Sequence, residues 1–141
     1  MKPGLILFVE DDPDDAHLTQ RALRKAGVSH RIVHVTDGEA ALHYLFPQAG
    51  EPPELPAVVF LDLKLPKVDG AEVLRRIRTT ERTRRLPVVI LTSSKERRDL
   101  DRCYDAGANS YVCKPIDVLG FQEAVRSLGL YWLLVNEGPP A

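Results

Sequence analysis

Five short apolar segments, separated by helical patterns, set the fold class of this chain. They are rich in branched side chains and lie at residues 5–9, 31–35, 57–61, 87–91 and 110–114. The first, third and fourth are apolar almost throughout, which is typical of strands covered on both faces. The second, RIVHV, is more mixed, as expected of an edge strand. Strands that alternate with helices form right-handed crossovers, so the sequence predicts a parallel sheet with helices on both faces.

Helix start and stop signals occupy the segments between these strands. The first helix is predicted from about Asp14 to Ala26, because Pro13 and two acidic residues open it and Gly27 closes it. The other predicted helices cover about residues 39–46, 71–79, 97–106 and 118–135. The stretch 47–56 holds four prolines and predicts a loop. This alternation favours an α/β fold of the flavodoxin-like (βα)5 type, a doubly wound parallel sheet with strand order 2-1-3-4-5.

Length, charge and cysteine content narrow the class of protein. The 141 residues are expected to form one domain, because a chain of this size can bury one core and not two. A net charge of -1 and an isoelectric point near 6.4 argue against nucleic acid as a partner. Cys103 and Cys113 lack the spacing of a disulfide framework or a zinc site, so we interpret them as reduced thiols. The chain shows no signal peptide and no apolar run of roughly 20 residues, so we expect a cytoplasmic protein without membrane contact.

Acidic residues directly follow the first and third predicted strands. Glu10, Asp11 and Asp12 come after the first strand, and Asp62 comes after the third. In a 2-1-3-4-5 sheet these strands are neighbours, about 4.8 Å apart, and the ligand site lies beyond their carboxyl ends. Carboxylates crowded without a cation would repel each other, and one would take up a proton. We therefore expect a hard divalent cation with oxygen ligands, and Mg²⁺ fits best.

Polar residues at the ends of the fourth and fifth predicted strands complete the same edge. Thr92 and Ser93 follow the fourth strand, and Lys114 ends the fifth. A hydroxyl, an ammonium and a metal around one carboxylate would surround an anionic tetrahedral group attached to it. This combination predicts phosphoryl transfer onto Asp62, because catalysis of that reaction is mainly positioning and charge neutralisation.

Several of these residues also have a purely structural interpretation. Acidic residues after a strand are often helix caps, and we favour a cap for Asp12 and Asp14 but a metal ligand for Asp11. Asp37, before Gly38, is interpreted as a turn or helix-start residue. The four histidines lack ligand spacing and are expected at surface or half-buried positions. The arginine-rich stretches of the third and fourth helices are expected to be solvated, with a docking surface as the alternative.

Four motifs stand at the predicted strand ends, namely LILFVEDD, FLDLKLPKVDG, PVVILTSS and NSYVCKP. In this order and spacing they resemble the receiver domain of bacterial two-component response regulators over nearly the whole chain. The resemblance implies that Asp62 is the phospho-acceptor, which attacks the phosphohistidine of a sensor histidine kinase to form an acyl phosphate. It also implies that Asp11 binds Mg²⁺ directly, that Glu10 acts through water or a more distant contact, and that the backbone carbonyl of Lys64 completes the coordination.

The same resemblance implies a switch next to the acceptor. Thr92 would hydrogen-bond one phosphoryl oxygen and move inward on phosphorylation, while Lys114 would pair with another. The bond between Lys114 and Pro115 would be cis. Tyr111 matches the aromatic residue that moves between outward and inward positions as Thr92 shifts. Phosphorylation would then shift the population of two states of a surface formed by helix 4, strand 5 and helix 5.

Lys64 departs from the family pattern, in which the residue two positions after the acceptor is often small or polar. The metal site should survive this change, because only the backbone carbonyl is needed there. We hypothesise that the Lys64 ammonium leans over the phosphoryl group and alters the lifetime of the acyl phosphate.

Three further segments resemble the single-domain response regulators that pair with bacterial and cyanobacterial phytochromes. They are LTQRAL, RCYDAGANSYVCKP and the tail LGLYWLLVNEGPP. This similarity implies a red-light-sensing histidine kinase as the partner. The chain ends about where a receiver ends, so we expect one receiver domain over 1–141, with no output domain and with an apolar extension of the last helix at about 129–141.

The segment LYWLLV at 130–135 is apolar on every face, whereas a surface helix should have a polar side. It either packs against its own domain or contributes to a homodimer. We favour the dimer, in which Tyr131, Trp132 and Leu134 meet the partner chain beside the surface of helix 4, strand 5 and helix 5.

Three other functions fit the sequence less well. A phosphatase or phosphotransferase of the haloacid dehalogenase kind would need a second aspartate where Lys64 stands. A phosphorylation-independent, receiver-like adaptor is the main alternative, but it would not need the full set Asp11, Asp62, Thr92 and Lys114. A transcription factor is disfavoured by the expected lack of an output domain and of basic charge. We therefore predict a signalling protein that promotes only its own phosphorylation and dephosphorylation and is not a separate enzyme.

Overall fold

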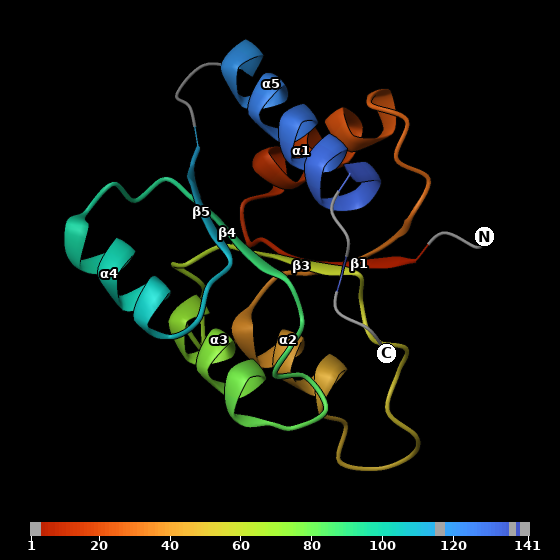
Figure 1. Cartoon of the computed structure of the whole chain (residues 1–141), viewed down its shortest axis with the longest axis vertical. Helices are drawn as coiled ribbons and strands as arrows, with labels where there is room; N and C mark the ends of the chain where they lie inside the picture. Colours follow the sequence, from red (N-terminus) through yellow and green to blue (C-terminus); the bar gives the residue numbers. More distant parts are fainter. Residues whose placement is uncertain (1–3, 115–117, 136–137, 139–141) are drawn as a thin grey trace.

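Five parallel strands form the centre of the molecule in the computed structural model, which describes residues 4–114, 118–135 and 138 (Figure 1). The strands are β1 (Leu5–Val9), β2 (Arg31–Val35), β3 (Val58–Leu61), β4 (Val88–Thr92) and β5 (Ser110–Cys113). Their order in the sheet is β2-β1-β3-β4-β5, and each neighbouring pair is parallel. The predicted fold class and strand order are confirmed, with β2 and β5 at the edges.

Helices cover both faces of the sheet. They are α1 (Pro13–Lys25), α2 (Gly38–Leu45), α3 (Gly70–Thr79), α4 (Arg97–Asp105) and α5 (Val118–Gly129). Helices α1 and α5 lie on one face, and α2, α3 and α4 lie on the other (Figure 1). Among the described residues, none of the helices combines the length and apolar character that a membrane span requires.

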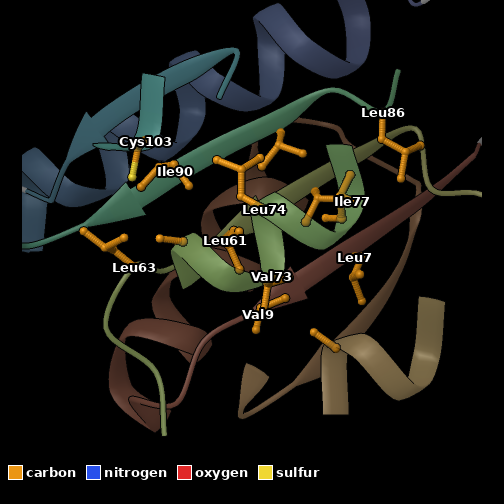
Figure 2. Packing of buried hydrophobic residues seen from close by; sticks show 14 of the residues in the cluster. Leu7, Val9, Leu61, Leu63, Val73, Leu74, Ile77, Leu86, Ile90 and Cys103 are labelled. Carbon is orange, nitrogen blue, oxygen red and sulfur yellow. The ribbon is translucent and has the colours of Figure 1, made fainter. Parts of the chain in front are cut away.

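The sheet separates two hydrophobic cores, and β1 contributes to both. Leu7 and Val9 pack with α2 and α3 in one core, whereas Ile6 and Phe8 pack with α1 and α5 in the other. This alternation follows the two-residue period of a strand. Figure 2 shows the first core, in which side chains of β1, β3, β4 and α3 converge. Because both faces are covered, β1 must be apolar throughout, as its sequence is.

The start of α1 differs in part from the prediction. Asp12 is the N-cap, and its Oδ1 accepts hydrogen bonds from the backbone N–H groups of Asp14 (2.9 Å) and Asp15 (3.1 Å). The prediction of a cap at Asp14 is wrong, because Pro13 already occupies the first helical position. Asp37 is the N-cap of α2, as predicted.

The last helix also differs from the prediction of one continuous helix over 118–135. Its α-helical part ends at Gly129, and a wider π-helical segment, η1 (Leu130–Val135), follows. A Cβ atom at Gly129 would lie 2.9 Å from Cδ2 of Leu23, so any other residue there would force the buried Leu23 side chain to shift. The same glycine weakens the α-helical run at the point where the helix widens.

Arg78, in the arginine-rich stretch of α3, was predicted to be solvated, and the structure shows that it is not. It is half-buried, and burial lowers the pKa of its guanidinium. The guanidinium donates hydrogen bonds to the carbonyl oxygens of Leu86 (2.7 Å), Gly107 (2.8 Å) and Arg84 (3.2 Å) and to Oδ1 of Asn109 (2.7 Å). Arg78 thereby joins the end of α3 to the segments that lead into β4 and β5.

Candidate functional site

Three acidic residues meet beyond the carboxyl ends of β1 and β3. The two strands pair as far as Val9 and Leu61, which places the following residues, Glu10 and Asp62, side by side. One oxygen from each of Glu10, Asp11 and Asp62 lies within 4.8 Å of the other two. Glu10 and Asp62 are buried, and Asp11 is exposed. The structure thus brings these acids together, and their oxygen donors fit a hard divalent cation such as Mg²⁺.

Lys114 supplies a positive charge within this cluster. Its backbone N–H donates to the carbonyl oxygen of Thr92 (2.7 Å) and so extends the pairing of β4 and β5. Its Nζ donates to Oε1 of Glu10 at 2.5 Å and to Oδ2 of Asp62 at 3.1 Å. Burial alone would lower the pKa of this ammonium, but the hydrogen bonds to Glu10 and Asp15 and the charge of Asp62 raise it. Lys114 therefore stays charged.

Asp15 is a third carboxylate partner of Lys114, and the sequence did not reveal it. Nζ of Lys114 donates to Oδ2 of Asp15 at 2.9 Å. In the sequence Asp15 is only one of several acids at the start of a helix, and no local pattern distinguishes it. The bond between Lys114 and Pro115, predicted to be cis, lies outside the described residues.

The buried carboxyl group of Glu10 has an altered acidity. Burial raises its pKa to about 7, although the hydrogen bond from Lys114 opposes this shift. Below pH 7 the group is therefore increasingly protonated in the metal-free protein, and a divalent cation must displace that proton. We expect the association constant for Mg²⁺ to fall about ten-fold from pH 8 to pH 6.

Isothermal titration calorimetry at several pH values checks this expectation. A Glu10→Gln variant is the control, because it cannot take up the proton and its Mg²⁺ affinity should vary less with pH. The same pH dependence in both proteins would show that another group binds the proton.

The loop after β3 holds Asp62 toward the cluster. The backbone N–H of Gly70 donates to the carbonyl oxygen of Leu63 at 2.7 Å. A Cβ atom at Gly70 would lie 2.2 Å from the carbonyl oxygen of Asp62, so only glycine lets α3 begin this close to the acid. Lys64 is exposed, and its backbone N–H lies 3.4 Å from Oδ1 of Asp62. Together with Asp11 it lines an open cavity of about 430 Å³ beside the cluster.

Thr92 is connected to Tyr111 through Ser94. Thr92 is buried, and its Oγ1 accepts from the backbone N–H of Ser94 at 3.4 Å. The hydroxyl of the half-buried Tyr111 donates to the carbonyl oxygen of Ser94 at 2.9 Å. The Ser94 hydroxyl donates to Oδ2 of Asp99 at 2.6 Å. The sequence identified Thr92 and Tyr111 but missed Ser94 and Asp99, for which the second serine of LTSS was the only signal.

His34 on β2 supports the backbone of the cluster. Its Nε2 lies 2.9 Å from the carbonyl oxygen of Glu10, and its ring stacks on Phe8 with ring centroids 5.2 Å apart. Because a carbonyl oxygen can only accept, His34 carries its proton on Nε2. This contact holds the point at which the chain leaves β1 for the acidic residues.

The arrangement of acids, lysine and hydroxyl is matched by a known family over most of the chain. Residues 6–126 match the family described as the response regulator receiver domain. The chain belongs to this family. It is a receiver-domain response regulator of two-component systems, a class of signalling proteins.

Known relatives resemble this receiver over nearly their whole length. The probable methanogenesis regulatory protein FilR2 of Methanothrix harundinacea is 44% identical over 137 residues, which cover 97% of this chain and 88% of FilR2. The Mn²⁺-bound form of the response regulator Rcp1, a protein of Synechocystis, has a TM-score of 0.90 and 34% identity over 98% of this chain and 100% of Rcp1. The phosphorylated cyanobacterial phytochrome response regulator RcpA has a TM-score of 0.91 and 35% identity over 99% of this chain and 100% of RcpA.

Proposed function

We propose that this receiver accepts a phosphoryl group on Asp62 from a sensor histidine kinase in a Mg²⁺-dependent step. The proposal rests on one observation, the convergence of Lys114, Glu10 and Asp11 on the Asp62 carboxylate. An oxygen of Asp62 attacks the phosphorus of the phosphohistidine, and the bond from phosphorus to nitrogen breaks as the imidazole leaves with the electron pair. Lys114 balances part of the negative charge that arrives on Asp62.

Four groups of this chain would hold the metal. They are the carboxylates of Glu10, Asp11 and Asp62 and the backbone carbonyl of Lys64. A bound Mg²⁺ supplies positive charge to the phosphoryl oxygens and orients them. The buried position of Glu10 and Asp62 excludes water from one side of the site, which strengthens these interactions.

Phosphoryl uptake from acetyl phosphate tests the proposal. Intact mass spectrometry should show the gain of one phosphoryl group in Mg²⁺ and no gain in EDTA, because the single charge of Lys114 does not offset the acids that the anionic donor must approach. No gain from acetyl phosphate and none from a phosphorylated histidine kinase, both in saturating Mg²⁺, would contradict the proposal. That result would favour the alternative, a phosphorylation-independent adaptor.

We propose that the signal then passes from Thr92 to Tyr111. A phosphoryl oxygen offers the Thr92 hydroxyl an acceptor, and Thr92 moves toward it. The backbone of Ser94 is hydrogen-bonded to both Thr92 and Tyr111, so a displacement of Ser94 shifts the Tyr111 hydroxyl. The surface of α4, β5 and α5 would thus change its population of states with phosphorylation.

Lys64 is proposed to alter how long the phosphoryl group persists. Its side chain is exposed and lines the cavity beside Asp11, and the proposal is that the ammonium leans from there over the phosphoryl oxygens. We expect Lys64→Asn to change the rate of phosphoryl loss about three- to ten-fold. Loss followed by intact mass checks this, and decay at the wild-type rate would contradict it.

The partner is proposed to be a phytochrome-type histidine kinase in the cytoplasm, on the similarity to the cyanobacterial phytochrome response regulator RcpA. FilR2 is named for a different process, so direct phosphotransfer from candidate kinases is the decisive measurement. The chain would act as a single receiver domain over 1–141, without nucleic acid or membrane as a partner and without a separate enzymatic activity.

A homodimer is proposed to cover the end of α5. An open groove of about 550 Å³, lined in part by Val112, Leu128, Tyr131 and Trp132, lies between β5 and the last helical turns. Trp132 packs on its own domain, but Tyr131 is 51% exposed and meets Trp132 edge-on. The side chain of Leu134 lies outside the described residues. Light scattering with and without phosphorylation tests the dimer, and a monomer at high concentration in both states would reject it.

A further inference from the structure

The Lys114 ammonium is fully engaged before any phosphoryl group arrives. An ammonium has three N–H groups, and three carboxylates accept from Nζ of Lys114, those of Glu10, Asp15 and Asp62. One positive charge is therefore shared among three acids. A phosphoryl group on Asp62 adds anionic oxygens to the same volume, while the number of N–H groups stays at three.

The three carboxylates that accept from Lys114 differ in the free-energy cost of losing that hydrogen bond. The side chains of Glu10 and Asp62 are 1% and 10% exposed, so an unpaired carboxylate there would remain without water. Asp62 also carries the incoming group, so its contact with Lys114 passes to the phosphoryl oxygens. The side chain of Asp15 is 33% exposed and lies in the first turn of α1, where water and the helix N-terminus stabilise a free carboxylate. Asp15 is therefore the partner whose hydrogen bond with Lys114 breaks at the lowest free-energy cost.

We propose that Asp15 is a positioning residue that holds the Lys114 ammonium back from the phosphoryl group and releases it on phosphorylation. This inference rests on the proposed function of Asp62 as acceptor. In the unphosphorylated protein the Asp15 carboxylate takes a share of the lysine charge and ties it to α1. Removing the Asp15 carboxylate leaves more of the lysine charge for the phosphoryl oxygens. It also removes in advance the Lys114–Asp15 hydrogen bond, which the phosphorylated protein would have to break.

The test compares Asp15→Asn with Asp14→Asn. Both variants remove one negative charge from the first turn of α1, but the structure gives Asp14 no side-chain contact with Lys114, and Asp14 is exposed. At saturating Mg²⁺ we expect Asp15→Asn to take up a phosphoryl group from acetyl phosphate about three- to ten-fold faster than wild type. Asp14→Asn should stay within about two-fold. Asp15→Glu, which keeps the carboxylate, should return the rate to near the wild-type value.

Binding of beryllofluoride, a non-covalent phosphoryl analogue, gives a readout that does not depend on turnover. Asp15→Asn should bind it more tightly than wild type, by about the same factor as the gain in rate. Equal rates and affinities for Asp15→Asn and Asp14→Asn, or a slower Asp15→Asn, would overturn the inference. If the wild-type protein neither took up a phosphoryl group nor bound beryllofluoride, the proposed acceptor function would itself be wrong. This outcome differs from a failure of the inference about Asp15, because it is seen in the wild type alone.

Discussion

Replacement of Asp62 by asparagine is expected to abolish phosphoryl uptake. Asparagine has nearly the same shape, but its amide lacks the nucleophilic carboxylate oxygen that forms the acyl phosphate. Lys114 keeps its contacts with Glu10 and Asp15, so the site should stay assembled. Intact mass spectrometry with acetyl phosphate and Mg²⁺ should show uptake by wild type and a loss of at least about 100-fold in the variant.

Asp69→Asn is the matched control for this experiment. Asp69 lies on the same loop, where its side chain caps α3 by accepting from the backbone N–H of Glu72 (3.0 Å) and also accepts from Arg102 (3.1 Å). Asparagine caps a helix as well as aspartate does, so this variant should fold and take up the phosphoryl group normally. Uptake by Asp62→Asn at the wild-type rate would move the acceptor to another carboxylate of the cluster.

The fold could be predicted because the patterns that specify its strands and helices lie within short stretches of the sequence. The strands between helices are short and apolar, and the handedness of crossovers allows few arrangements of them. The rule that ligands bind beyond the carboxyl ends of parallel strands then placed Glu10, Asp62 and Lys114 at one edge of the sheet. None of these steps needs a side-chain contact.

The unpredicted features depend on contacts between distant segments. Asp15 and Lys114 are 99 positions apart in sequence, and they meet only because the fold brings the side chain of Lys114, which follows β5, to the first turn of α1. The link from Ser94 to Asp99 depends on how α4 begins. A sequence pattern gives the chemical type of such residues but not which partner each one finds.

Arg78 shows the same limit for stability, and its replacement by methionine is the second large effect that we expect. Its neighbours Arg75 and Arg76 are exposed, and the run of arginines alone does not separate the three. Methionine keeps the aliphatic volume but removes every donor. The carbonyl oxygens of Leu86 and Gly107 would lose their guanidinium partner, and Oδ1 of Asn109 would keep only the backbone N–H of Val88. We expect the free energy of unfolding to fall by about 2–4 kcal/mol, measured by urea denaturation.

Arg75→Met is the control, because it removes an arginine from the same helix. Arg75 is exposed, and within the described part of the chain its guanidinium pairs with Glu72 on the same helix, a contact that solvent screens and that contributes little to stability. The difference between the two variants therefore isolates the four hydrogen bonds of Arg78 from the general effect of losing a positive charge. An equal loss of stability in both would mean that water replaces the guanidinium at these carbonyl groups. In that case Arg78 would act as a solvated arginine, and the junction of α3 with β4 and β5 would be held by backbone contacts alone.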